Sequence, residues 1–426
     1  MYHDPDLAPA TAATRPPSAV SGGVGLAGLA GLVAWLLVAR RMGWDGPRAA
    51  LVGVAAAALP MIGWSLLVDR VHRRPSTGLD WDAPRPWRAG IDDALLGLAG
   101  TWATWAAIGA VYATLRFYWQ EPFAGAMQVL LAALPVLAVL SAPYLLWLER
   151  YRTGSRDGAW HLGAWLTGQP GWDKGAIAAH ARGWAVKGFF LPFMLAIVPG
   201  GFAQVVDTDP AAVLADPAGL VAALTGLMFV VDVAVATAGY WLTLRPLDAH
   251  IRSANPFASG WAAALVCYPP FLLMDAGGPL DYRPGTRAWS WWLAAHPALL
   301  WGWGALLVAL TAIYAWATLA FGPRFSNLTN RGIVTHGPYR WSRHPAYLSK
   351  NLYWVAATLP ILSVDAWPEG ARACALMAMV AGVYYWRART EERHLLLDPD
   401  YRAYHRWISR HGAVPRLVGR LIGRAA

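Results

Sequence analysis

Long apolar runs constrain this chain more than any other feature of its sequence. A helix needs roughly 20 apolar residues to cross the hydrocarbon core of a bilayer. Runs of about this length lie near residues 22–39, 48–68, 94–115, 127–147, 183–203, 219–240 and 298–321. A weaker run, 258–275, contains Pro269 and Pro270, so we expect it to be kinked or only partly inserted.

Near the C-terminus two shorter runs, 351–363 and 370–386, are separated by a few polar residues and predict a helical hairpin. The expected fold is therefore all-α: a polytopic helical membrane protein with about ten transmembrane helices, the last two forming that hairpin.

The composition agrees with lipid as the main solvent. Charged residues make up 14% of the chain, against about 25% in soluble domains. The 26 Trp and 16 Tyr suit aromatic belts at the two membrane interfaces. The net charge of +10 is typical of cytoplasmic loops that face anionic lipid, and we expect no nucleic-acid partner.

The loops indicate an orientation. Placing both termini in the cytoplasm puts nearly every basic loop on the cytoplasmic side, and only Arg40, Arg41 and Arg48 fall on the wrong side. The residues that favour this placement are Arg70, Arg73, Arg74, Arg85, Arg88, Arg150, Arg152, Arg156, Lys174, Arg245 and Arg252. The Ala-, Arg- and Trp-rich composition suggests a bacterial inner membrane.

The chain divides into three parts. Residues 1–20 are rich in Pro, Ala and Thr and are expected to be disordered, and residues 21–290 form an N-terminal transmembrane bundle without a recognisable role. Residues 291–426 hold the densest polar motifs. Within the bundle, Asp232 lies in an apolar run, where it is either functional or a hydrogen-bonded tie between two helices.

The first polar motif runs from His336 to Tyr347 and reads H-G-P-Y-R-W-S-R-H-P-A-Y. Proline suits the first turn of a helix and favours an extended conformation for the preceding residue, so we expect a helix to begin at Pro345. Its free N–H groups then face the loop that holds Arg340 and Arg343, which suits a carboxylate or a phosphate. A cluster that meets lipid phosphate is the alternative interpretation.

The second polar motif follows the hairpin and reads R-A-R-T-E-E from Arg387 to Glu392. Arg387 and Glu391 are four residues apart and Arg389 and Glu392 three apart, so each pair can share a helix face. The two carboxylates point about 100° apart, and one can be paired while the other faces a cleft. Tyr401, Tyr404 and Pro415-Arg416 follow in the tail.

Together these motifs resemble the isoprenylcysteine carboxyl methyltransferase family and related phospholipid methyltransferases, over roughly Phe321 to Arg416. The resemblance implies a methyltransferase-like membrane domain in 291–426 that binds S-adenosylmethionine between the R-H-P loop, the hairpin and the tail. The cofactor-binding residues that we expect are His336, Gly337, Tyr339, Arg343, His344, Pro345, Tyr347, Glu391, Glu392, Tyr401 and Tyr404, with Arg416 covering the cofactor or reaching the substrate.

Methyl transfer needs alignment of a nucleophile and no metal, and no metal-ligand cluster is visible. The expected acceptor is a lipidic or amphiphilic molecule that presents a carboxylate, thiol or amine. Arg340 or Arg343 would orient an anionic acceptor, whereas His336, His344 or Glu392 would act as a base for a protonated one. The expected catalytic residues are Arg340, Arg343, His344 and Glu392.

One departure and two alternatives stay open. The family often has a small residue, commonly Gly, soon after R-H-P-x-Y, whereas this chain has Leu348-Ser349-Lys350-Asn351, and Lys350 would either crowd the pocket or add a contact to an anion. An NADPH-dependent sterol-reductase-like oxidoreductase is the first alternative, because such enzymes share a similar loop. A non-catalytic lipid-binding relative is the second. The sequence names neither the acceptor nor an oligomeric state.

Overall fold

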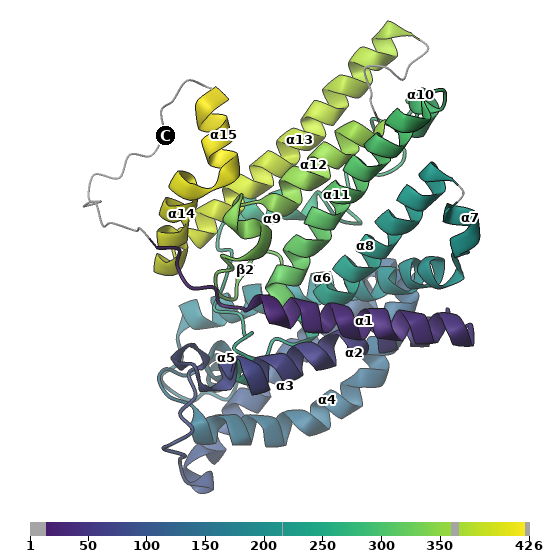
Figure 1. The fold of residues 1–426 in the computed structure, drawn as a ribbon. Coiled ribbons are helices and arrows are strands. Elements are labelled where there is room, and N and C mark those ends of the chain that lie inside the picture. Colours follow the sequence, from purple (N-terminus) through teal and green to yellow (C-terminus); the bar gives the residue numbers. More distant parts are fainter. Residues whose placement is uncertain (1–13, 215, 359–365, 422–426) are drawn as a thin grey trace.

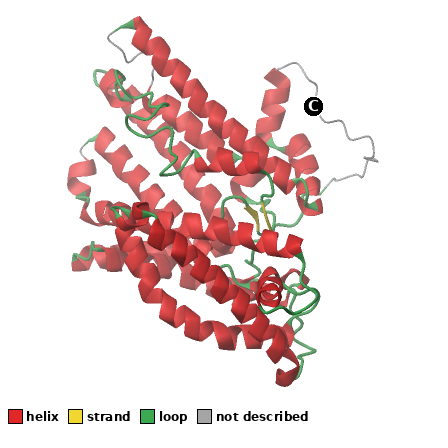
Figure 2. Ribbon diagram, turned by 180° about the vertical axis from the view of Figure 1, so that it is seen from behind, coloured by secondary structure: helices red, strands yellow, loops and turns green. Residues whose placement is uncertain are grey.

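The computed structural model describes residues 14–214, 216–358 and 366–421 and is built almost entirely from helices (Figures 1 and 2). The N-terminal part contains α1 (Gly22–Met42), α2 (Pro47–Gly63), α3 (Ile91–Thr114), α4 (Phe123–Tyr151), α5 (Gly158–Leu166), α6 (Lys174–Asp207), α7 (Pro210–Leu214) and α8 (Pro217–Trp241). A π-helical turn at Trp64–Val68 extends α2. Short 3₁₀ turns lie at Val71–Arg73, Pro75–Thr77, Trp87–Gly90, Arg116–Trp119, Arg245–Leu247, Gly322–Arg324 and Gly337–Arg340.

The C-terminal part adds α9 (Ala258–Leu265), α10 (Trp289–Leu293), α11 (Pro297–Phe321), α12 (Pro345–Thr358), α13 (Trp367–Leu395), α14 (Pro399–His411) and α15 (Ala413–Leu421). Two-residue strands β1 (Ser253–Ala254) and β2 (Thr329–Asn330) pair antiparallel, with Ser253 opposite Asn330. Helices α11, α12 and α13 run side by side, as the expected hairpin requires (Figures 1 and 2). The tip of that hairpin, 359–365, lies outside the described residues.

Within the described ranges, seven helices are long and apolar enough to cross a membrane. They are Gly22–Met42, Pro47–Val68, Trp87–Thr114, Phe123–Tyr151, Lys174–Asp207, Pro217–Trp241 and Pro297–Arg324, which match the long apolar runs of the sequence. The chain is therefore an all-α polytopic membrane protein. The last two helices, α12 and α13, pack together but do not meet this measure.

The weak run at 258–275 does not form a spanning helix. Only α9 is helical, and turns follow from Val266 to Pro270 and beyond. The two prolines supply no backbone donors, which explains why the helix does not continue. Helix α9 packs against α13.

Helix α8 forms the centre of the molecule. Every residue from Val230 to Tyr240 is buried, and its neighbours include α6 and α11. At the end of α8, Gly239 lets the loop after α11 come close: a Cβ there would lie 2.6 Å from the carbonyl oxygen of Phe325. The loop that carries the polar motifs is thus seated on the central helix.

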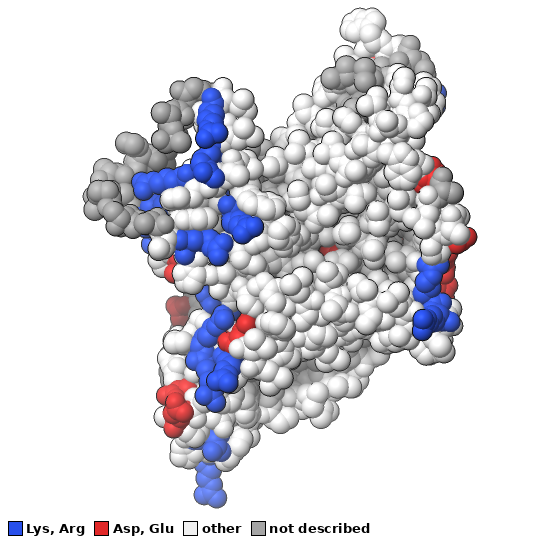
Figure 3. Space-filling model, viewed as in Figure 1, with Lys and Arg blue, Asp and Glu red and all other residues white. Residues whose placement is uncertain are grey.

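Lysine and arginine side chains gather on one side of the molecule, around α14 and α15 and below them (Figure 3). A smaller mixed group of charges lies at the opposite side, and the surface between is mostly uncharged. This distribution is typical of a protein whose uncharged band faces lipid.

Candidate functional site

Two buried arginines fix the loop between α11 and α12. Arg331 is 2% exposed and donates to backbone carbonyls rather than to a carboxylate. Its four acceptors are the carbonyl oxygens of Ala249 (2.6 Å), Gly239 (2.9 Å), Phe325 (2.8 Å) and Leu242 (3.3 Å). Because unpaired carbonyls at a helix C-terminus need donors, Arg331 joins this loop to the end of α8.

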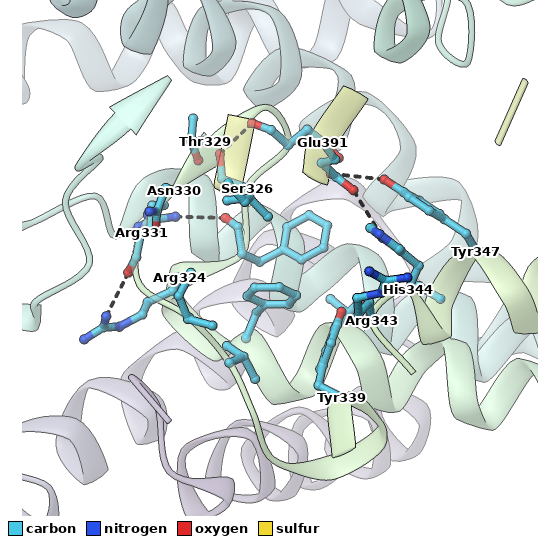
Figure 4. Close-up of a pocket in the computed structure, with 18 of the residues that line it drawn as sticks. Arg324, Ser326, Thr329, Asn330, Arg331, Tyr339, Arg343, His344, Tyr347 and Glu391 are labelled. Atoms are coloured by element: carbon cyan, nitrogen blue, oxygen red, sulfur yellow. Dashed lines mark hydrogen bonds and ion pairs between the residues drawn. The ribbon is translucent and has the colours of Figure 1, made fainter. Parts of the chain in front are cut away.

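Arg324 makes the second attachment. It donates to the carbonyl oxygen of Arg331 at 2.8 Å and pairs with the carboxylate of Asp248 at 2.5 Å. Asp248 also accepts from Ser76 at 2.8 Å and from Arg252 at 3.3 Å. The loop therefore rests on a network that reaches back to Ser76, and Figure 4 shows both arginines at the left of the cavity.

A cavity runs from this loop along the three adjacent helices α11, α12 and α13. Its polar end contains Arg343, His344 and Glu391. Its inner end lies between Tyr314 of α11, Lys350 of α12 and Tyr384 of α13. At a rise of 1.5 Å per residue, Lys350 lies about 9 Å along α12 from His344, so the cavity is elongated parallel to the helices.

At the polar end two neighbouring carboxylates of α13 face the start of α12, and Figure 4 shows one of them, Glu391, beside His344 and Tyr347. Glu391 lines the cavity, accepts from the Tyr347 hydroxyl at 3.2 Å and lies 3.7 Å from Nδ1 of His344. Glu392 lies behind them, with only 5% of its side chain exposed, and contacts His344 Nε2 at 3.0 Å and Arg343 Nε at 3.2 Å. The adjacent carboxylates thus have different environments.

The charges around Glu392 keep it ionised. Burial raises the pKa of its carboxyl, but the hydrogen bond from His344 and the charge of Arg343 outweigh burial, so the pKa lies below its ordinary value. A second arginine, Arg389, contacts Glu392 at 3.0 Å from the more exposed side. Glu392 therefore acts as a fixed anion that positions Arg343 and His344.

Helix α14 closes the polar end. The Tyr404 hydroxyl donates to the carbonyl oxygen of Tyr339 at 2.6 Å, and Tyr401 lines the cavity beside it. Arg343 also contacts the ring of His405 on α14. Burial and the charge of Arg343 lower the pKa of His405, so its ring is neutral near pH 7.

The structure brings together most of the residues selected from the sequence. Tyr339, Arg343, His344, Tyr347, Glu391, Tyr401 and Tyr404 line the cavity. Pro345 begins α12 as expected. Glu392 contacts the cavity residues from behind, and Arg416 bonds the carbonyl oxygen of Gly412 within the tail.

Three others lie elsewhere. Arg340 is exposed, with its guanidinium 5.8 Å from the ring of Trp341. His336 bonds Ser18 at 3.0 Å, and Gly337, at φ 58°, makes a turn beside Trp316. None of the three is among the cavity-lining residues.

Part of the N-terminal segment lies against the loop between α11 and α12. The amide of Ala19 donates to Ile333 at 2.8 Å, and the Thr335 hydroxyl donates to the carbonyl oxygen of Pro16 at 2.9 Å. Residues 1–13 of the segment expected to be disordered lie outside the described residues, whereas residues 16–19 lie along the site loop.

Sequence reasoning missed the inner end. Tyr268, Tyr314 and Thr318 line it, and Asp232 of α8 accepts from Tyr314 at 2.9 Å and from Thr318. Asp232 therefore links α8 to α11 through hydrogen bonds, which is one of the two roles expected for it from the sequence. It lies directly behind the cavity wall. Tyr314 and Thr318 are four residues apart on one helix face, which is a signal that the sequence contained.

Residues 303–397 match a family model described as the isoprenylcysteine carboxyl methyltransferase (ICMT) family. No curated protein and no solved structure matches the chain. The matched range begins inside α11 and ends just before α14, so it includes the R-H-P and E-E motifs but not Tyr401, Tyr404 or Arg416. The match supports a membrane methyltransferase in general terms. The resemblance inferred from the motifs is confirmed: the C-terminal part of this chain, residues 303–397, is similar to the isoprenylcysteine carboxyl methyltransferase family.

Proposed function

We propose that the protein is a membrane-embedded, S-adenosylmethionine-dependent methyltransferase that acts on a lipidic or amphiphilic acceptor presenting a carboxylate, thiol or amine. The observation that carries the proposal is the cavity itself. Its polar end holds a cation and a carboxylate on facing helices, and its inner end continues between helices α11, α12 and α13.

The side chains at the polar end fit the chemical groups of this cofactor. Arg343, beside the first turn of α12, suits a carboxylate, because a guanidinium and a helix N-terminus both attract anions. Glu391, whose carboxylate lines the cavity, suits an ammonium group or a ribose diol. Tyr339, Tyr401 and Phe321 supply apolar wall for a flat ring. When bound, S-adenosylmethionine supplies an activated methyl group on a sulfonium.

The chain's own part in the reaction is then mainly positioning. His344 is held with its Nε2 3.0 Å from Glu392 and its Nδ1 3.7 Å from Glu391. Since each ring nitrogen faces a carboxylate, we assign His344 to positioning rather than to proton abstraction. Alignment of bound reactants supplies up to about 7–11 kcal/mol in well-studied cases, so a site of this kind needs no metal.

We further propose that the polar end faces the cytoplasm of a bacterial inner membrane, with both termini on that side. The basic side chains gathered around α14 and α15 (Figure 3) support this orientation, because basic loops remain cytoplasmic. A soluble methyl donor would then reach the polar end from water, and an acceptor with an apolar tail would reach the inner end from the bilayer.

Calorimetry on the detergent-purified protein tests the proposal, with S-adenosylhomocysteine and NADPH as the two ligands. We expect S-adenosylhomocysteine to bind, and Arg343→Ala and Glu391→Ala to weaken that binding at least ten-fold, since a hydrogen bond to a charged group contributes about 1.5–3 kcal/mol. Arg410→Ala, an exposed arginine of α14, is the matched control. Binding of NADPH without S-adenosylhomocysteine would instead support the reductase alternative.

A further inference from the structure

An aromatic box at the inner end of the cavity surrounds the ammonium of Lys350. Its three rings are those of Trp354 on α12, Tyr384 on α13 and Tyr314 on α11, with centroids 5.0 Å, 5.3 Å and 5.7 Å from Nζ. Distances of this size are within the range of cation–π attraction, and such boxes bind quaternary ammonium ligands in other proteins. Here the occupant is a side chain of the protein itself.

Lys350 has no other strong partner. Over the described ranges of the chain, no hydrogen bond or ion pair involves its Nζ. The nearest acid behind the box, Asp232, already accepts from Tyr314 and Thr318. The side chain is half-buried and lines the cavity. Its positive charge is therefore available to whatever occupies the inner end.

A second cation adds to this charge. Arg387 lines the same part of the cavity, one turn along α13 from Tyr384, and its guanidinium lies 5.2 Å from the rings of Tyr268 and Tyr347. Its hydrogen-bond acceptors are neutral: Asn327 at 2.6 Å and the Tyr268 hydroxyl at 3.3 Å. Glu391, the acidic residue among those lining the cavity, lies at the polar end.

We propose that Lys350 determines acceptor specificity: by filling the aromatic box it excludes ammonium head groups from the inner end of the cavity. This inference rests on the proposed methyltransferase function and narrows its acceptors. An ammonium would have to displace Lys350 from the three rings and would then meet two cations at close range. Of the three acceptor classes left open by the sequence, the box excludes charged amines.

The box depends on the N-terminal bundle. Asp232 of α8 fixes the Tyr314 hydroxyl at 2.9 Å and so holds one of the three rings in place. Asp232 is thus a positioning residue, and it lies outside the region that matches the family model. This gives residues 21–290 a part in building the inner end.

The test is a gain of binding. Decyltrimethylammonium and decanoate, matched in chain length, are titrated calorimetrically into the wild type, Lys350→Met and Lys350→Arg in a nonionic detergent, with empty micelles as the blank. We expect Lys350→Met to bind decyltrimethylammonium about thirty-fold more tightly than the wild type, since a desolvated cation–π contact contributes roughly 2 kcal/mol and about 1.4 kcal/mol is ten-fold in affinity. Lys350→Arg, which keeps the cation, should behave like the wild type.

A second variant ties the gain to the box. Adding Trp354→Leu to Lys350→Met removes one ring and should abolish the gained binding. If Lys350→Met binds decyltrimethylammonium no better than Lys350→Arg does, the proposal is wrong. Binding of S-adenosylhomocysteine, measured on the same samples, shows that each variant is folded. A wild type that binds no S-adenosylhomocysteine would refute the proposed function, whereas loss of the gain alone refutes only the role of Lys350.

Discussion

Substitution of the two neighbouring glutamates of α13 should have different effects: loss of the Glu392 charge should lower stability, and loss of the Glu391 charge should weaken ligand binding. Glu392 is 4% exposed and contacts Arg343, Arg389 and the His344 ring at 3.0–3.2 Å. Glu392→Gln keeps the shape of the side chain but removes its charge. Glu391 is more exposed, lines the cavity and accepts one hydrogen bond, from Tyr347. Glu391→Gln is therefore a control that differs by one position in the sequence.

The cost of Glu392→Gln can be worked from its contacts. Arg389 is 59% exposed, so its pair with Glu392 contributes less than about 1 kcal/mol. Removing the anion of a buried pair costs about 3–5 kcal/mol. Arg343 is 26% exposed and partly screened by solvent. We therefore assign about 2 kcal/mol, below that range, to the combined contacts of Glu392 with Arg343 and His344. The expected loss of unfolding free energy is about 2–3 kcal/mol, or a melting temperature lower by about 5–10 °C.

Thermal unfolding in detergent, followed by tryptophan fluorescence, measures the first half of this prediction. Glu391→Gln should unfold within about 2 °C of the wild type, because the glutamine oxygen can still accept from Tyr347 and the change from a charged to a neutral acceptor costs only about 1 kcal/mol. Calorimetry with S-adenosylhomocysteine measures the second half, where Glu391→Gln should lose at least ten-fold in affinity. A Glu392→Gln variant as stable as the wild type would refute the assignment of Glu392 as the anion that holds Arg343 and His344.

Three further predictions concern other parts of the site. Burial is the main reason that the pKa of His394 falls from 6.5 to about 4. The unfolded state therefore binds the proton more readily, so the free energy of unfolding should decrease by up to about 3 kcal/mol as the pH is lowered from 6.5 to 4. His394→Gln should flatten that part of a plot of melting temperature against pH. Arg331→Met leaves two buried and two partly buried carbonyls without this donor, so we expect at least about 3 kcal/mol of lost stability by chemical denaturation. Tyr404→Phe removes the donor to Tyr339 and should cost about 1–3 kcal/mol in the same assay, with Tyr385→Phe on the exposed face of α13 as its control.

The helices could be predicted from the sequence because their determinants are local, whereas the meeting of the R-H-P loop with the E-E pair was expected from the family resemblance alone. Apolar length predicts a spanning segment whatever it packs against. The start of α12 follows from Pro345 alone, and the spacing of Arg389 and Glu392 is enough to place them on one face of α13. Each of these inferences needs only residues within one or two turns.

The inner end could not be predicted because its determinants come from separate helices. Asp232 and Tyr314 are far apart in the sequence, and only the packing of α8 against α11 makes them partners. The aromatic box likewise needs α11, α12 and α13 in register. Arg340 was selected because it belongs to the R-x-x-R-H-P motif, yet the 3₁₀ turn at Gly337–Arg340 leaves its side chain exposed.

The pairing of β1 with β2 has a practical consequence for the expression of fragments of this protein. Four residues in two strands join the stretch after α8 to the wall of the cavity, and Arg331 fastens the same wall to carbonyls that precede β1. A gene fragment cut to the family-matching stretch would encode the motifs without the surface on which they are assembled. Chimeras that graft this stretch onto another membrane anchor should therefore carry the segment from α8 through β1 as well.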